Sequence, residues 1–205
     1  MVKATYKHTG KMNGMVSIST YKGCNGQCEA YSKIEGSICQ HCYVDRALRY
    51  KNNLPKYIEN YNILNNRDIT TDEIKALKLD NYKFIRFEAF GDLGSTQCFI
   101  NYCKICNYYN DSNFTLWTKN PHFIAEALKT IKKPKNLIII VSSLFVNVPY
   151  ENKRGYNFID KIFTVYDDNY IKHNDITINC GAKQCITCKQ CYKRNKIQYI
   201  NEKLK

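Results

Sequence analysis

Eight of the eleven cysteines fall into two tight groups near opposite ends of the chain. The first group consists of Cys24, Cys28, Cys39 and Cys42, and the second of Cys180, Cys185, Cys188 and Cys191. In the second group, spaced C-x4-C-x2-C-x2-C, the short steps allow tight turns to direct successive sulfurs to one inorganic centre, a pattern typical of cubane iron–sulfur clusters. Because a single zinc ion usually takes cysteine pairs that lie far apart in the chain, the spacing favours a cluster over zinc.

The first group is spaced more widely, as C-x3-C-x10-C-x2-C. Cys39 and Cys42 form a good ligand pair, and Cys24 is the next candidate. With Cys28 left out, the spacing becomes C-x14-C-x2-C, an expanded form of the three-cysteine arrangement in which radical enzymes leave one iron open for a cofactor. The compact form of that arrangement, C-x3-C-x2-C, does not occur in the group, and Cys28 remains an additional candidate ligand.

The other three cysteines, Cys98, Cys103 and Cys106, fall on a predicted helix. Cysteine without a ligand partner commonly behaves as a small buried hydrophobic residue. We therefore expect these three thiols to pack in the core and to take no part in a metal site.

The composition indicates one globular domain over residues 1–205, since 44% of the residues are apolar and the mean hydropathy is −0.50. The longest aliphatic run, residues 137–141, is too short to cross a bilayer, and the first 14 residues lack the apolar segment of a secretory signal. We therefore expect a cytoplasmic location and no membrane partner. In a reducing compartment the thiols are ligands or stay free, and an odd number of cysteines fits a disulfide framework poorly.

The net charge of +13 is concentrated at the two ends of the chain. Residues 1–22 carry four lysines and no acidic residue, and residues 180–205 carry six lysines and one arginine against one acidic residue. Such ends can attract nucleic acid or another anionic partner. Two alternatives remain open: the lysines balance the negative charge of a thiolate-ligated cluster, or they reflect the Lys, Asn, Ile and Tyr usage of an AT-rich genome.

Strand and helix patterns alternate along the chain. Strands are expected at residues 15–20, 82–90, 114–118, 137–142, 161–166 and 176–179. Helices are expected at residues 42–51, 55–64, 71–77, 95–109, 121–131 and 188–196. Strands that alternate with helices indicate βαβ units, so we predict an α/β fold with a mostly parallel sheet or an incomplete TIM-like barrel of about six strands.

Polar or ligating residues follow each expected strand. Asp92, Lys119 and Ser142 are the candidate cofactor-binding residues among them. The carboxyl ends of parallel strands share one rim, where sites of α/β proteins are built, so we expect the cysteine-rich loops of both groups at this rim. Whether the two groups hold one shared cluster or two remains open. The alternative for Asp92 is to cap the next helix, and that for Lys119 is to be an ordinary solvated lysine.

Three blocks of sequence carry a resemblance to a known family. They are residues 39–50, with Cys39-Gln-His-Cys42-Tyr43-Val44 leading to Arg49-Tyr50; the strand with Arg86 that leads to Gly91-Asp92 and onward to Trp117-Thr118-Lys119; and Cys188-Lys-Gln-Cys191-Tyr192. Together they span about residues 15–192. In this ordered set the chain resembles the bacteriophage gene product 88 family of iron–sulfur proteins.

The resemblance implies a phage-encoded α/β protein of the host cytoplasm that binds one or two [4Fe-4S] clusters through cysteines from both ends. It also implies similarity to radical S-adenosylmethionine barrels. The leading hypothesis is a cluster-binding protein whose basic ends contact nucleic acid or a host protein. The alternatives are a radical S-adenosylmethionine enzyme and a zinc-stabilised nucleic-acid-binding module. Catalysis stays open, because the sequence contains no P-loop, dinucleotide fingerprint or nucleophile elbow.

Overall fold

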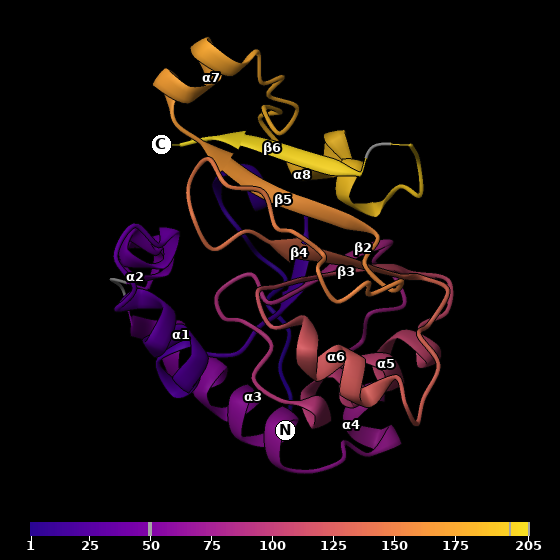
Figure 1. Cartoon of the computed structure of the whole chain (residues 1–205). Coiled ribbons are helices and arrows are strands. Elements are labelled where there is room, and N and C mark those ends of the chain that lie inside the picture. Colours follow the sequence, from indigo (N-terminus) through magenta and orange to yellow (C-terminus); the bar gives the residue numbers. More distant parts are fainter. Residues whose placement is uncertain (49–50, 197, 205) are drawn as a thin grey trace.

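The computed structural model describes residues 1–48, 51–196 and 198–204. Six strands follow one another in chain order across one open sheet, and every neighbouring pair is parallel (Figure 1). The strands are β1 (Val16–Ile18), β2 (Phe84–Phe87), β3 (Asn113–Thr118), β4 (Leu137–Ser142), β5 (Lys161–Tyr166) and β6 (Tyr199–Lys203). The predicted α/β fold with a parallel sheet of six strands is confirmed.

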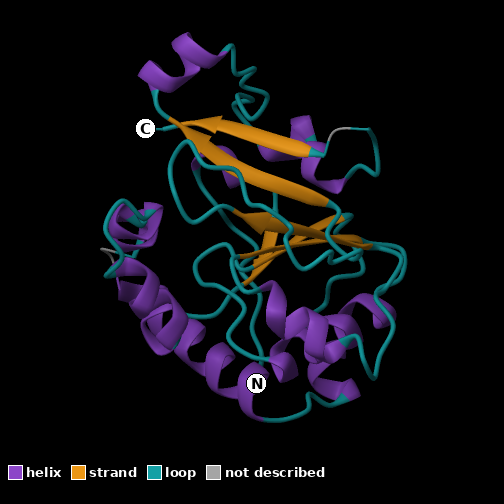
Figure 2. Cartoon of the chain, viewed as in Figure 1, coloured by secondary structure: helices purple, strands orange, loops and turns teal. Residues whose placement is uncertain are grey.

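Helices lie in the connections between neighbouring strands, except between β4 and β5, where residues 143–160 contain none (Figure 2). The α-helices are α1 (Gly26–Ser32), α2 (Tyr43–Ala47), α3 (Leu54–Asn66), α4 (Thr71–Lys75), α5 (Thr96–Tyr108), α6 (Pro121–Ala127), α7 (Asp168–Asn174) and α8 (Cys185–Cys188). Short 3-10 helices are η1 (Gly10–Met12), η2 (Lys22–Cys24), η3 (Ile38–His41), η4 (Lys51–Asn53) and η5 (Gln190–Tyr192). Within the described ranges, no helix combines the length and the apolar character that crossing a membrane requires.

The sheet has two different faces because side chains alternate along each strand. In β2, Ile85 and Phe87 point into the larger core, whereas Arg86 between them points to the opposite face. In β4 the odd-numbered apolar residues join the larger core, whereas Ile138 and Ile140 form a smaller cluster on the opposite face. We call the face toward the larger core the outer face and the opposite one the inner face.

The outer face is covered by helices α3 to α6 (Figure 1). Right-handed connections between strands in sequential order place the connecting helices on one side of the sheet. The core between them contains Phe87, Phe99, Tyr102 and Phe114, all completely buried, and the Phe87 ring stacks on Tyr102 with centroids 4.0 Å apart. Burial of each such aromatic side chain contributes about 1.5–3 kcal/mol to folding.

The helix starts are those that the sequence signals predict. Thr70 accepts a hydrogen bond from the backbone N–H of Glu73, whose carboxylate accepts from the Thr70 N–H, so α4 begins with a capping box. The hydroxyl of Ser95 caps α5, and Pro121 occupies the first turn of α6.

The predicted strand at residues 176–179 is wrong, and the sixth strand is β6 instead. The backbone N–H groups of Asn179 and Cys180 both donate to the carbonyl of Asn201, and the Asn179 side chain bonds the backbone of β6. The segment therefore lies along β6, held by asparagine side chains where a regular ladder would use backbone groups. The predicted helix at residues 188–196 is replaced by α8 and η5, and α1 and α7 were not predicted.

The predicted helix at residues 42–51 is confirmed over α2. Residues 49 and 50, which belong to one block of the family resemblance, lie outside the described residues.

Candidate metal centre

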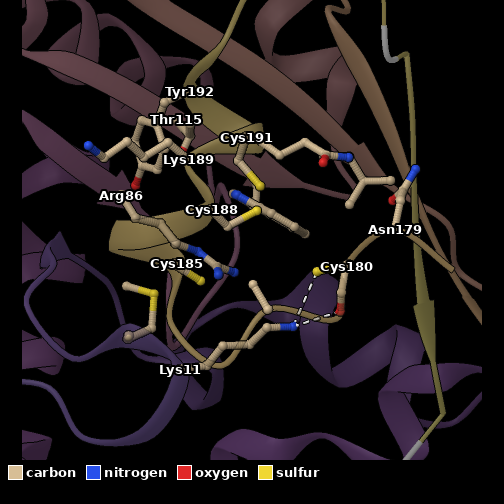
Figure 3. Close-up of a pocket in the computed structure, with 15 residues that line it drawn as sticks. Lys11, Arg86, Thr115, Asn179, Cys180, Cys185, Cys188, Lys189, Cys191 and Tyr192 are labelled. Carbon is tan, nitrogen blue, oxygen red and sulfur yellow. Dashed lines mark hydrogen bonds between the residues drawn. The ribbon is translucent and has the colours of Figure 1, made fainter.

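The four cysteines of the C-terminal group line one pocket on the inner face of the sheet (Figure 3). The strands contribute Arg86 from β2, Thr115 and Trp117 from β3, and Ile200 from β6. Lys11 reaches the pocket from the N-terminal segment. Residues from both ends of the chain therefore meet at this pocket, beside the strands β2 and β3.

A sharp bend in the backbone brings the last three thiols to this pocket. Helix α8 ends at Lys189, whose φ of 55° is left-handed and whose N–H donates to the carbonyl of Cys185. The chain then turns into η5, and the Tyr192 ring packs edge-on against Phe84, with centroids 5.2 Å apart. The Cys191 side chain packs against the smaller apolar cluster of the inner face. The spacing of two residues thus produces the tight turns that the sequence predicts.

Two cationic side chains face the thiols. The Lys11 ammonium group donates to the Cys180 sulfur at 3.2 Å and forms an ion pair with Glu202 at 2.8 Å. The Arg86 guanidinium lies over the Trp117 ring, 4.3 Å from its centroid, and points in among the four sulfurs (Figure 3). Cationic neighbours of this kind stabilise thiolates, which are the form of cysteine that binds metal.

Burial favours the neutral form of three of these thiols, those of Cys180, Cys185 and Cys191. Burial raises the pKa of Cys191 to about 12, against the opposing effect of the Arg86 charge. Burial also raises the pKa of Cys185, opposed by Arg86 and Lys11, and that of Cys180, where Glu202 adds to the rise. Metal binding would therefore release protons from these thiols, because a coordinated thiol is deprotonated.

Four cysteine thiolates are the donor set of an iron–sulfur cluster, and the pocket supplies four cysteines. Across residues 1–48, 51–196 and 198–204, no three His, Cys, Asp or Glu side chains converge closely enough to hold one metal ion. In a cubane each thiolate binds a different iron, so the four sulfurs stand apart around the centre. The free volume of the pocket is about 30 Å³, room for one or two water molecules, so binding of a cluster requires the pocket to widen.

The first cysteine group lies at the carboxyl ends of the strands, as predicted for this loop. Asn25 caps α1 and donates its side-chain amide to the carbonyl of Asp92, which follows β2. Farther along the loop, the Ile38 N–H donates to the carbonyl of Leu144, just beyond β4. These bonds fasten the loop across the rim from β2 to β4.

Three thiols of the first group share one cation. The Lys119 ammonium group interacts with the Asp92 carboxylate and with the thiols of Cys28, Cys39 and Cys42. Burial is the largest single influence and favours the neutral form of Lys119, but the charges of Asp92 and of the three thiols together outweigh it and raise the pKa of the lysine. Burial raises the pKa of Cys28 above its ordinary value, and the charges of Asp92 and Glu88 add to the rise. The structure thus groups Cys28 with the Cys39 and Cys42 pair.

The remaining predicted residues have separate surroundings. Cys24 lies on η2, and burial raises the pKa of its thiol. The buried Asp92 carboxylate accepts from the Thr118 hydroxyl at 2.5 Å and from the N–H groups of Leu93 and Lys119, so it fixes the turn after β3. Ser142 is the last residue of β4. Because side chains alternate along the strand, it lies on the inner face, as Ile140 does.

The two cysteine groups occupy different places, one at the rim and one on the inner face. The expectation that the second group follows the last strand is wrong, because these cysteines precede β6 and cross the inner face. Lys189 of this segment lies over the ring of Phe84, the first residue of β2, and so marks the amino-terminal side of the pocket. The structure therefore presents two separate thiol sites.

Sequence analysis did not predict the roles of Lys11 and Glu88. Lys11 carries no spacing signal, since it meets Cys180 only through the fold. Glu88 follows β2 with a left-handed φ of 55°, and its buried carboxylate accepts from the Tyr102 hydroxyl at 2.6 Å and from Thr20. Burial raises the pKa of Glu88 to about 7. For Arg86 a signal was present, because alternation with Ile85 and Phe87 directs it to the inner face.

An open parallel sheet with thiols on its inner face and at its carboxyl rim defines a cysteine-rich α/β protein. The family model described as Gene product 88 matches residues 3–204, and the chain belongs to this family of phage gene products. The membership of the gene product 88 family that the sequence predicts is thereby confirmed, whereas the match does not test the predicted iron–sulfur cluster or the similarity to radical S-adenosylmethionine barrels. Comparison with curated proteins and with solved structures gave no match.

Proposed function

We propose that this protein binds a [4Fe-4S] cluster through Cys180, Cys185, Cys188 and Cys191. The observation that carries the proposal is that these four thiols line a single pocket together with the cations Arg86 and Lys11. A cubane held by four thiolates is negatively charged, and the two cations compensate that charge. The cluster would also tie the segment before β6 to the N-terminal segment, since metal binding contributes directly to folding free energy.

The test is the metal content of protein purified and reconstituted without oxygen. We expect about four iron and four sulfide per chain, with the broad visible absorbance of thiolate-bound iron. The double variant Cys188→Ser/Cys191→Ser should lose the iron, whereas Cys103→Ser, which alters a thiol of the outer core, should keep it. Wild-type protein without iron and sulfide contradicts the proposal. Stoichiometric zinc without iron would assign the protein to the zinc-stabilised class.

A second candidate function is supported by the first cysteine group. Cys28, Cys39, Cys42 and Asp92 all interact electrostatically with Lys119 at the carboxyl rim, where α/β enzymes build their active sites. Three thiol ligands leave one iron of a cluster open, which is the arrangement that a radical S-adenosylmethionine enzyme uses. Lys119, Asp92 and the nearby Ser142 would then be available to bind the cofactor.

The enzyme hypothesis is tested by reductive cleavage of S-adenosylmethionine. Reduced, reconstituted protein should release 5′-deoxyadenosine, and Cys39→Ser should abolish the release while the C-terminal site keeps its iron. No cleavage by protein that carries a full cluster complement would exclude this second function and leave the first intact.

A further inference from the structure

The Arg86 guanidinium is a cation of the inner face that has no carboxylate partner. Across the described ranges of the chain, no Asp or Glu oxygen lies within ion-pair distance of this side chain, and its Nε is buried without a hydrogen-bond partner. The guanidinium lies over the Trp117 ring. A charge held against a largely apolar face is unfavourable unless an anion compensates it.

The groups around Arg86 identify the anion that would compensate it. The guanidinium interacts electrostatically with the thiols of Cys185 and Cys191 and lies among the four sulfurs in Figure 3. The pocket has two other cations: Lys11, which is already engaged by Glu202, and Lys189, which lies over the ring of Phe84. Arg86 is the cation that lies among the thiols themselves, and its charge is available to a ligand that they bind.

We propose that Arg86 sets the reduction potential of the centre held by the C-terminal cysteines, a role that rests on the proposed cluster. One electron from a reductant such as dithionite converts the thiolate-ligated [4Fe-4S] cluster from a dianion to a trianion, and no bond forms or breaks. A neighbouring positive charge stabilises the trianion more than the dianion. Net charge and hydrogen bonding near the sulfurs are the features that tune such potentials. Arg86 is thus a positioning and charge-compensating residue.

Position and charge can be separated with two substitutions. Arg86→Gln removes the charge and keeps a polar side chain, whereas Arg86→Lys keeps the charge and loses the planar group over Trp117. The matched control is Lys83→Gln, which removes one positive charge from an exposed position just before β2. Each variant is reconstituted as the full chain, its iron is quantified, and its midpoint potential is measured by redox titration followed by electron paramagnetic resonance.

We expect the midpoint of Arg86→Gln to move to more negative potential, with Arg86→Lys close to wild type and Lys83→Gln unchanged. An unchanged midpoint in an iron-replete Arg86→Gln variant overturns the proposal. If Arg86→Gln fails to hold iron, retention of iron and potential by Arg86→Lys supports the charge role, and loss of iron in both variants overturns it. Wild-type protein without iron is a failure of the proposed function, and the iron assay distinguishes that result from a failure of the Arg86 role.

Discussion

Both faces of the sheet have cysteines packed on them, but the surroundings of these cysteines differ. On the outer face, Cys98, Cys103 and Cys106 of α5 are 0%, 3% and 0% exposed and pack among aromatic and aliphatic side chains. On the inner face the C-terminal cysteines are only partly buried and lie beside cations. The difference separates a thiol that serves as a small hydrophobic side chain from one that is placed to bind a ligand.

Burial raises the pKa of thiols on both faces, and a cation opposes the rise at Cys191 and at Cys103, where Lys133 is near, but not at Cys106. Burial raises the pKa of Cys106 well above its ordinary value, and the nearby Cys103 thiol adds to the rise. Burial also raises the pKa of Cys191, but there Arg86 opposes it. The inner face therefore offers a cation that assists ionisation, which the surroundings of Cys106 do not.

The largest expected effect is a loss of bound iron when a thiol of the inner face, and not one of the outer face, is replaced by serine. Cys191→Ser should remove most of the bound iron, because serine is a poor substitute for a thiolate ligand of a cubane. Cys103→Ser should leave the iron content at the wild-type level. Iron and sulfide analysis of the two proteins, prepared side by side without oxygen, measures the contrast. Equal iron in both variants would abolish the distinction between the faces.

The next effect concerns the pH dependence of stability that the buried carboxyl group of Glu88 produces. Because burial raises the folded pKa of Glu88 from 4.5 to about 7, the folded state binds more protons than the unfolded state between these pH values. The Glu88 contribution to the free energy of unfolding should therefore fall as the pH rises through this window, by up to about 3 kcal/mol. His8, whose pKa burial lowers from 6.5 to about 4, adds an opposing rise below pH 6.5, so the Glu88 effect is the difference between wild type and a variant without this carboxyl group. Denaturant unfolding from pH 5 to 8 measures this slope.

The matched control for this slope is a pair of glutamine substitutions. Glu88→Gln should remove the fall of stability with pH and leave the rise contributed by His8, whereas the exposed Glu126→Gln should leave the pH dependence as in wild type. A wild-type slope retained in Glu88→Gln would assign the dependence to another group, such as Asp92, whose pKa is also raised by burial.

A smaller loss of stability is expected from a polar atom placed in the outer core. Cys106→Ser replaces a completely buried thiol by a hydroxyl among apolar neighbours and should lower the free energy of unfolding by about 2 kcal/mol. The iron content should not change. If urea unfolding instead showed no loss of stability, the thiol would not be the packed hydrophobic group that the structure describes.

The smallest effect is expected from removing the charge of Lys11 in the inner-face pocket. Lys11→Met removes the ion pair with Glu202 and the hydrogen bond to Cys180 but keeps the apolar stem. Because the pair is partly exposed, the metal-free protein should lose at most about 1 kcal/mol of stability. Thermal unfolding of the metal-free form measures it, and a loss several times larger would show that the pair is a main support of the fold.

Much of the fold could be predicted from sequence, because strands such as 137–142 and helices such as α4 carry local signals. β6 could not, since Tyr199–Lys203 is a polar edge strand with few apolar residues. The earlier segment at 176–179 looks equally extended but bonds β6 through Asn179. Local pattern does not decide which of two such segments joins the sheet.

The candidate site was predictable in its ligands and not in its arrangement. The steps of two residues around Cys188 marked the second group, because a tight turn is a local property. The position of that group in the fold depends on whether its cysteines precede or follow the last strand, β6, along the chain. The contacts of Lys11 and Glu88 are made between residues distant in sequence, so no local pattern contains them.

The most direct test of the account is the alkylation pattern of the eleven cysteines, mapped by mass spectrometry before and after iron is removed by a chelator. We predict that the C-terminal thiols resist alkylation in the iron-loaded protein and react once the iron is gone. Cys98, Cys103 and Cys106 should stay unreactive in both folded forms because they are buried. Equal reactivity of the C-terminal thiols with and without iron would contradict the claim that they hold the cluster.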